Sequence, residues 1–348
     1  MKTITLPRFN DMHVHFRLGQ MLKNVAPVTA SYCSRAVVMP NTLPRPILNA
    51  DDVIWYRDEI NRALEDAGVS LGHFTPLMTI KIRDDTTPKM IHSAVYAGGA
   101  IAGKVYPKGV TTNSGNGLTS FKGIGKTLSK MEDSGMVLLL HGELDLERTI
   151  QSEWEAAFLP QLEWLSANFP NLGIVLEHVS SAEAVQAVLD LPDNVAATIT
   201  VHHLVLTEND VIGTKIRPHN ACRPMPKDFT DRDLLLEMAM SGNPKFFLGS
   251  DSAPHHRRSK ECAEGACGIY TAPILPSLLA ETFEEHGALD KLEAFTSRNG
   301  AVFYDLPLGG EFFPAETIML VEDPWMVPDE VDGIVPFMAG QTMCYKLA

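Results

Sequence analysis

The chain alternates short apolar segments with longer amphipathic ones, and this alternation restricts the possible folds more than any other feature. Eight short runs have the length and composition of buried strands: residues 12–16, 36–39, 75–80, 101–105, 137–140, 173–176, 195–200 and 246–249. Several of them, such as MVLLL and GIVLE, are apolar throughout, which is typical of strands covered on both faces. Segments expected to be helical lie between them: residues 51–66, 88–97, 123–134, 149–169, 181–189 and 230–241.

Eight strands alternating with helices predict an α/β fold, a (β/α)8 TIM barrel of parallel strands. The alternative is an open doubly wound sheet, which usually has a glycine-rich first turn, whereas the first strand here ends in His-Val-His-Phe-Arg. After Asp305 the pattern changes, and short strands are expected within residues 316–327 and 340–348. We therefore expect a single domain, with the barrel at about residues 9–305 and a small C-terminal appendage at 306–348.

Composition restricts the partners and the compartment. The 348 residues carry a net charge of −14, which argues against a nucleic-acid partner because phosphate backbones are bound by basic surfaces. No apolar run approaches the length of a membrane span, and the N-terminus has no apolar segment typical of a secretory signal. The five cysteines form no Cys-x-x-Cys pair. We therefore expect a cytoplasmic protein with reduced cysteines and no membrane partner.

Polar side chains stand at the ends of several predicted strands. His13 and His15 are two residues apart, so in a strand they project to the same side and can converge on one cation. His141, His178 and Asp251 each end a different strand. Because the C-terminal strand ends of a barrel meet at one mouth, these side chains together form a nitrogen and oxygen ligand set suited to Zn²⁺. Any one of the histidines alone is equally well explained as an ordinary histidine near the surface.

Lys104 lies inside the small apolar segment GGAIAGKV. Burial there would disfavour the ammonium form and lower its pKa. A neutral amine can take up CO₂ and become a carbamate, whose two oxygens could bridge two cations at the spacing of a two-metal site. In the alternative interpretation, the stem is buried and the amine reaches water. The residues alone leave both interpretations open.

Two further groups contain side chains of the kind that bind metals. His202 and His203 follow the apolar run VAATITV, and adjacent residues of a strand point to opposite sides, so a structural or supporting role is favoured over a second ligand pair. Cys262 and Cys267 lack the second pair of a zinc knuckle, and we interpret their segment as an active-site loop.

The chain resembles the amidohydrolase superfamily and, more narrowly, the short bacterial-type dihydroorotase family, from about residue 9 to the C-terminus. The motifs that carry this resemblance occur in the family's order: DMHVH, MPNT, KVYP, HGE, EH and GSDSAPH. The stretches YPKGVTTNS and SDSAPHHRRSKE make the narrower resemblance specific. It implies a zinc-dependent, homodimeric enzyme that interconverts (S)-dihydroorotate and N-carbamoyl-L-aspartate in the synthesis of UMP.

The resemblance also implies a role for each matching residue. Two Zn²⁺ ions per subunit would be held, the first by His13 and His15, the second by His141 and His178. Carboxylated Lys104 would bridge them. Asp251 would complete the shell of the first metal and act as the catalytic proton-transfer residue.

The implied substrate contacts lie around the same mouth. The α-carboxylate would be held by Arg17, Asn41 and His255, and the pyrimidine ring would meet backbone groups of Arg223 and Cys267. His141 would also contact the substrate. A flexible loop containing Thr111 and Thr112 would close over it.

Two other functions remain open. Another cyclic-amide hydrolase, such as a hydantoinase or an allantoinase, would need a different pocket, and Arg17, Asn41 and His255 favour an anchored carboxylate instead. A catalytically inactive barrel that serves as a scaffold would be expected to have lost metal ligands, and every expected ligand is present here.

Overall fold

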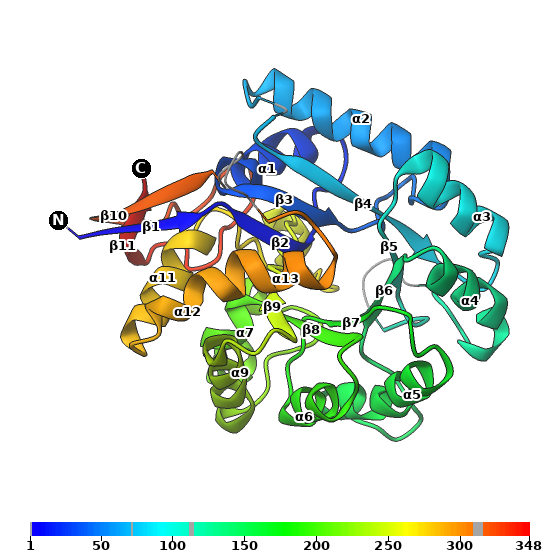
Figure 1. Ribbon diagram of the computed structural model, residues 1–348. Coiled ribbons are helices and arrows are strands. Elements are labelled where there is room, and N and C mark those ends of the chain that lie inside the picture. The colour runs from blue at the N-terminus through cyan, green and yellow to red at the C-terminus, as the bar shows by residue number, and fades with distance from the viewer. Residues whose placement is uncertain (1, 71, 111–114, 309–315) are drawn as a thin grey trace.

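The computed structural model describes the chain apart from residues 1, 71, 111–114 and 309–315. Eight parallel strands form one sheet in the order of the sequence: β2 (Phe9–Val14), β3 (Cys33–Val38), β4 (Thr75–Ile82), β5 (Ala102–Val105), β6 (Val137–His141), β7 (Ile174–Glu177), β8 (Val195–Ile199) and β9 (Phe246–Leu248). Figure 1 shows these strands at the centre of the molecule with helices around them. The predicted α/β barrel is confirmed, and each of the eight predicted strands overlaps an observed one.

The barrel closes where its first and last strands meet. Val14 and Ser252 form a parallel bridge, and the backbone N–H of His15 donates to the carbonyl of Ser252 at 3.1 Å. The backbone N–H of Asp251 donates to the carbonyl of His13 at 2.9 Å. Backbone hydrogen bonds thus join two residues with predicted metal-binding roles that lie far apart in the sequence.

Helices lie around the sheet and within the segments that connect its strands. They are α1 (Gly19–Tyr32), α2 (Ala50–Asp66), α3 (Pro88–Ser93), α4 (Gly125–Asp133), α5 (Trp154–Asn168), α6 (Ala182–Asp190), α7 (Val201–Val205), α8 (Asn209–Ile212), α9 (Phe229–Ser241), α10 (Arg257–Lys260), α11 (Leu275–Glu285), α12 (Leu289–Glu293) and α13 (Asn299–Phe303). Each of the six predicted helical segments overlaps an observed helix. Helix α1 was not predicted, since it has no side-chain N-cap and contains Pro27, so the local signals of a helix are weak.

The apolar strands are buried on both faces. In β6, Leu138 and Leu140 belong to the large cluster that packs strands against helices, whereas Leu139 belongs to a smaller cluster with Val175 and Phe247. Alternate residues of a strand point to opposite faces, so one set fills the barrel and the other contacts the helices. This accounts for the absence of polar residues from runs such as MVLLL.

A small antiparallel sheet lies beside the barrel and contains β1 (Thr3–Pro7), β10 (Thr317–Met326) and β11 (Thr342–Leu347), in the order β1-β10-β11. Both chain termini lie near it (Figure 1). The two C-terminal strands were predicted, whereas their N-terminal partner β1 was not. The division into a barrel at 9–305 and an appendage at 306–348 stays a prediction. In the described part of the chain, no helix is long and apolar enough to cross a membrane.

Candidate active site

Five of the predicted metal ligands converge at the mouth of the barrel. The Nε2 atoms of His13 and His15 lie 3.4 Å apart, and Oδ1 of Asp251 lies 3.4 Å and 3.1 Å from them, respectively. Nδ1 of His141 lies 3.2 Å from Nε2 of His178. The ring centroids of His13 and His178 are 5.1 Å apart, so the two groups are neighbours. All five side chains are buried.

The strand ends position these side chains, and two of them hold unusual backbone conformations. His178 directly follows β7, and Asp251 lies shortly after β9. Their φ angles are 44° and 41°, values that cost a non-glycine residue about 1–3 kcal/mol. The backbone N–H of His178 donates to Thr198 Oγ1 at 2.6 Å, and that of Asp251 bonds across the barrel closure. These bonds help to hold both residues in a conformation that aims their side chains at the mouth.

Two glutamates that were given no role in the sequence analysis contact the histidines. Oε2 of Glu177 lies 2.8 Å from Nδ1 of His13 and also accepts from the hydroxyl of Thr198 at 2.6 Å. Oε2 of Glu143 lies 2.8 Å from Nε2 of His141. A carboxylate on one ring nitrogen leaves the opposite nitrogen unprotonated, which is the arrangement common behind metal-binding histidines. The available signal was their place beside the histidines in the EH and HGE motifs.

The protonation states suit a cation. Burial lowers the pKa of His15 to about 3 and also lowers the pKa values of His141 and His178. Burial alone would raise the pKa of Asp251, but the hydrogen bond with His15 and the charge interactions with His13, His15 and His202 together outweigh it, so this pKa lies below its ordinary value. Neutral imidazoles and an ionised carboxylate are the forms that bind a divalent metal.

Lys104 lies in β5, fully buried, with Nζ 5.3 Å from the centre of the Tyr106 ring. Among the described residues, Nζ has no hydrogen-bond partner. Burial lowers the pKa of Lys104 to about 8, although the carboxylates of Glu177 and Asp251 oppose this shift. The interpretation in which the amine reaches water is wrong, because the whole residue is inaccessible to solvent. An orphaned buried amine near five metal-type ligands fits a group that is modified or bound in the working protein.

A cavity lies against these residues. Besides the histidines and Asp251, its wall includes four of the predicted substrate contacts: Arg17, Asn41, Arg223 and Cys267. The remaining predicted substrate contact, His255, lies against Arg17: Nε2 of His255 is 3.1 Å from Nη2 of Arg17. Thr111 and Thr112 lie outside the described residues, so the closing loop stays a prediction.

Arg17 is held firmly in this wall. Its Nε donates to the carbonyl of Pro254 at 3.2 Å, and its own carbonyl accepts from the hydroxyl of Tyr56 at 2.9 Å. Burial and the charge of Arg17 lower the pKa of His255 to about 3, so His255 is neutral and can accept from the guanidinium. The arrangement presents a fixed cation that can bind a carboxylate with two parallel hydrogen bonds.

The expected orientation of His202 and His203 is wrong. Residues 201–205 form the helix α7, so the adjacent rings do not point to opposite sides, and their centroids are 4.7 Å apart. Thr200 begins the helix, because its hydroxyl accepts from the backbone N–H of His203 at 3.1 Å. Both rings are buried.

Comparison with known proteins decides between the amidohydrolases. No family model matches the chain. A dihydroorotase from Aromatoleum aromaticum is 44% identical to it over 353 residues, which cover 100% of both chains. The chain belongs to the dihydroorotase family.

A solved structure of a dihydroorotase supports the same assignment. The crystal structure of dihydroorotase from Saccharomyces cerevisiae, in complex with 5-fluoroorotic acid, has a TM-score of 0.89 at 35% identity and covers 100% of this chain and 99% of that one. The L-hydantoinase of Arthrobacter aurescens has a TM-score of 0.82 but only 15% identity, covering 99% and 83% of the two chains, and it shares the fold alone. The resemblance to dihydroorotases is therefore confirmed.

Proposed function

We propose that this chain catalyses the reversible hydrolysis of (S)-dihydroorotate to N-carbamoyl-L-aspartate, and that the reverse reaction closes the ring during UMP synthesis. One observation supports this most: the side chains of His13, His15, His141, His178 and Asp251 meet at the barrel mouth of a chain that matches dihydroorotases over its full length.

The donor set fits two zinc ions, which share a preference for imidazole nitrogen and carboxylate oxygen. The residues that would hold them are His13, His15 and Asp251 for the first ion, His141 and His178 for the second, and Lys104 as a carbamate between them. The buried Nζ of Lys104, which has no hydrogen-bond partner among the residues that the structure describes, supports the carbamate. When bound, the pair of metals polarises the scissile carbonyl and lowers the pKa of the attacking water.

The protein's own residues would transfer the proton of the attacking water and orient the imidazole rings of the metal ligands. Asp251 is ionised, so its carboxylate can accept a proton from the attacking water and deliver it to the ring nitrogen that leaves. Glu177 contacts Nδ1 of His13, and Glu143 contacts Nε2 of His141. The opposite ring nitrogen of each histidine therefore stays unprotonated. These contacts keep the acceptor and the ligands in fixed positions throughout the cycle.

Arg17 would anchor the substrate. Dihydroorotate and N-carbamoyl-aspartate both carry the α-carboxylate, so one guanidinium can bind either molecule and serve both directions. His255 lies against Arg17, and Asn41 lines the same cavity. Backbone groups of Arg223 and Cys267 would contact the ring, and closure by the loop of Thr111 and Thr112 belongs to the same proposal.

The proposal is tested by following the loss of dihydroorotate absorbance with zinc-loaded protein, alongside hydantoin and allantoin. We expect kcat/KM for dihydroorotate to exceed that for the neutral rings by about a hundredfold or more, because a site built around a carboxylate leaves Arg17 unpaired without one. Equal turnover of the neutral rings would favour a hydantoinase or allantoinase. No turnover with zinc bound would favour an inactive scaffold.

The proposal includes a cytoplasmic homodimer. All five cysteines are free, which suits a reducing compartment. Light scattering of the purified chain should give twice the mass of one chain, and a mass of one chain at micromolar concentration would contradict the dimer.

A further inference from the structure

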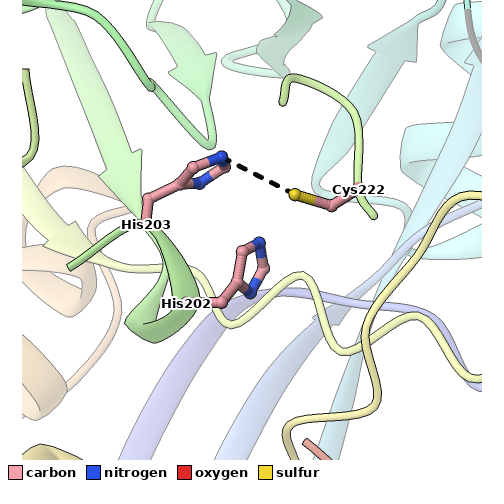
Figure 2. Close-up of side chains that lie close together, drawn as sticks. All are labelled: His202, His203 and Cys222. Atoms are coloured by element: carbon pink, nitrogen blue, oxygen red, sulfur yellow. Dashed lines mark hydrogen bonds between the residues drawn. The ribbon is translucent and has the colours of Figure 1, made fainter. Parts of the chain in front are cut away.

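A second group of metal-type side chains shares no residue with the ligands assigned above. His202 and His203 of α7 and Cys222 are all buried, and their potential ligand atoms lie within 4.8 Å of one another. Figure 2 shows the two rings and the thiol gathered around one small region, with His202 and His203 on the same helix and Cys222 on a separate segment. We call these three residues the α7 cluster.

His202 is the member that points to a ligand. Its side chain is inaccessible to solvent, and within the described part of the chain neither ring nitrogen has a hydrogen-bond partner. Buried polar groups nearly always have a partner, and a neutral imidazole has one donor and one acceptor to satisfy. Burial also keeps its pKa well below the ordinary value, so the ring is neutral. The unprotonated ring nitrogen of His202 therefore has a buried lone pair that no hydrogen-bond donor of the described residues uses.

The other two members have a spacing close to that of a zinc site. Sγ of Cys222 lies 3.8 Å from Nε2 of His203. Zinc bonds of about 2.3 Å to sulfur and about 2.0–2.1 Å to nitrogen, at the tetrahedral angle, place such atoms about 3.6 Å apart. The carbonyl oxygen of Pro224 lies 3.1 Å from both atoms and can act as a fourth donor.

The protons on Sγ of Cys222 and Nε2 of His203 do not prevent these two atoms from binding a cation. The Cys222 thiol and Nε2–H of His203 both lie in position to donate to the Pro224 carbonyl. Oγ1 of Thr200 lies 2.8 Å from Nδ1 of His203, and a hydroxyl can either donate to that nitrogen or accept from it. The His203 proton can thus occupy Nδ1 instead, which frees Nε2. Binding a cation then releases one proton, from the thiol, and both imidazoles stay neutral.

We propose that His202, His203 and Cys222 bind one thiophilic divalent cation, Zn²⁺ in the first place, at a site separate from the two ions of the barrel mouth. Sulfur and imidazole donors favour zinc over magnesium or calcium. The cation would join α7 to residues 222–224, and Arg223 between them lines the substrate cavity. The cation would stabilise the wall of the cavity that contains Arg223. The cation would take no part in the reaction.

Cobalt substitution tests this site apart from activity. The mouth ligands are nitrogen and oxygen, so a thiolate-to-cobalt charge-transfer band in the near ultraviolet reports a cysteine ligand. We expect this band in Co²⁺-saturated protein, its loss in Cys222→Ser and its retention in Cys344→Ser, which is the same change at an exposed cysteine. Elemental analysis of the zinc-loaded Cys222→Ser protein should give one ion fewer per chain.

His202→Gln provides a second variant, because glutamine keeps a neutral polar side chain and does not depend on Cys222→Ser folding. We expect about a tenfold or greater loss of cobalt affinity, read from titration of the band, with an unchanged circular dichroism spectrum. The proposal is overturned if the native protein gives no thiolate band at saturating Co²⁺. It is also overturned if Cys267→Ser removes the band and Cys222→Ser does not.

Discussion

The molecule contains two close histidine pairs, and different backbone geometry produces each of them. His13 and His15 alternate along the end of β2, and their Nε2 atoms lie 3.4 Å apart. His202 and His203 are adjacent in α7, where successive residues are rotated by about 100°, and their ring centroids lie 4.7 Å apart. Sequence spacing therefore predicts convergence only when the local secondary structure is known.

The two pairs also differ in the charge around them. At the mouth, the carboxylates of Glu177, Glu143 and Asp251 contact the histidines directly. In the α7 cluster, His203 contacts the Thr200 hydroxyl, the Pro224 carbonyl and the Cys222 sulfur, none of which is a carboxylate. A buried cation needs nearby negative charge, so the mouth should bind metal more tightly than the α7 cluster.

The largest effect should come from removing the residue proposed to join both metals. Lys104→Ala should lose most of the bound zinc at the mouth and all measurable turnover, because no oxygen bridge remains. Small carboxylic acids should restore part of both, which elemental analysis and the dihydroorotate assay can measure. Full activity without added acid would disprove the bridge.

Asp251→Asn should lower kcat by about 10²–10⁴-fold, the range for loss of a general acid or base. The amide has nearly the same shape but cannot accept the proton, so at least part of the metal should remain bound. Turnover and zinc content are measured on the same sample. Unchanged turnover would remove Asp251 from its proposed role.

Glu177→Gln tests whether the carboxylates distinguish the mouth from the α7 cluster. The variant should weaken zinc binding at the mouth by about 10–100-fold, since the neutral amide cannot supply the negative charge that Glu177 places on Nδ1 of His13. Competition with a chromophoric chelator gives the affinity. Glu293→Gln, the same change at an exposed position, is the control. Equal zinc affinity in both variants would contradict the role of Glu177.

Arg17→Lys should raise KM for dihydroorotate by about tenfold and leave the metal content unchanged, because an ammonium cannot form two parallel bonds to a carboxylate. Steady-state kinetics and elemental analysis test the two parts. Arg62→Lys, at a side chain that is 62% exposed, should leave both values unchanged. A lower zinc content in Arg17→Lys would show that the residue supports the metals instead of the substrate.

The smallest effect concerns the order of metal loss. A chelator added slowly to the cobalt-loaded protein should remove the thiolate band before activity falls, because no carboxylate among the described residues is hydrogen-bonded to the side chains of the α7 cluster. Absorbance and turnover are followed together. Loss of activity first would reverse the comparison of the two sites.

The sequence predicted what depends on local pattern. Apolar runs located all eight barrel strands, and their polar ends located His141, His178 and Asp251. Features that depend on distant partners were missed, such as β1, whose partner β10 lies near the other end of the chain. Helix α7 was missed because five residues are too short for a helical period, and Thr200 was assigned to the preceding strand.

The closure of the barrel has a consequence for biogenesis. His13 and His15 emerge from the ribosome early, whereas Asp251 emerges only after the intervening strands have been synthesised. The hydrogen bond between the backbone N–H of Asp251 and the carbonyl of His13 forms only when the two ends of the sheet join. If His13, His15 and Asp251 hold the first zinc ion as proposed, a nascent chain cannot present this full set of ligands, and metal capture becomes a late event that favours the completed barrel over partly folded forms.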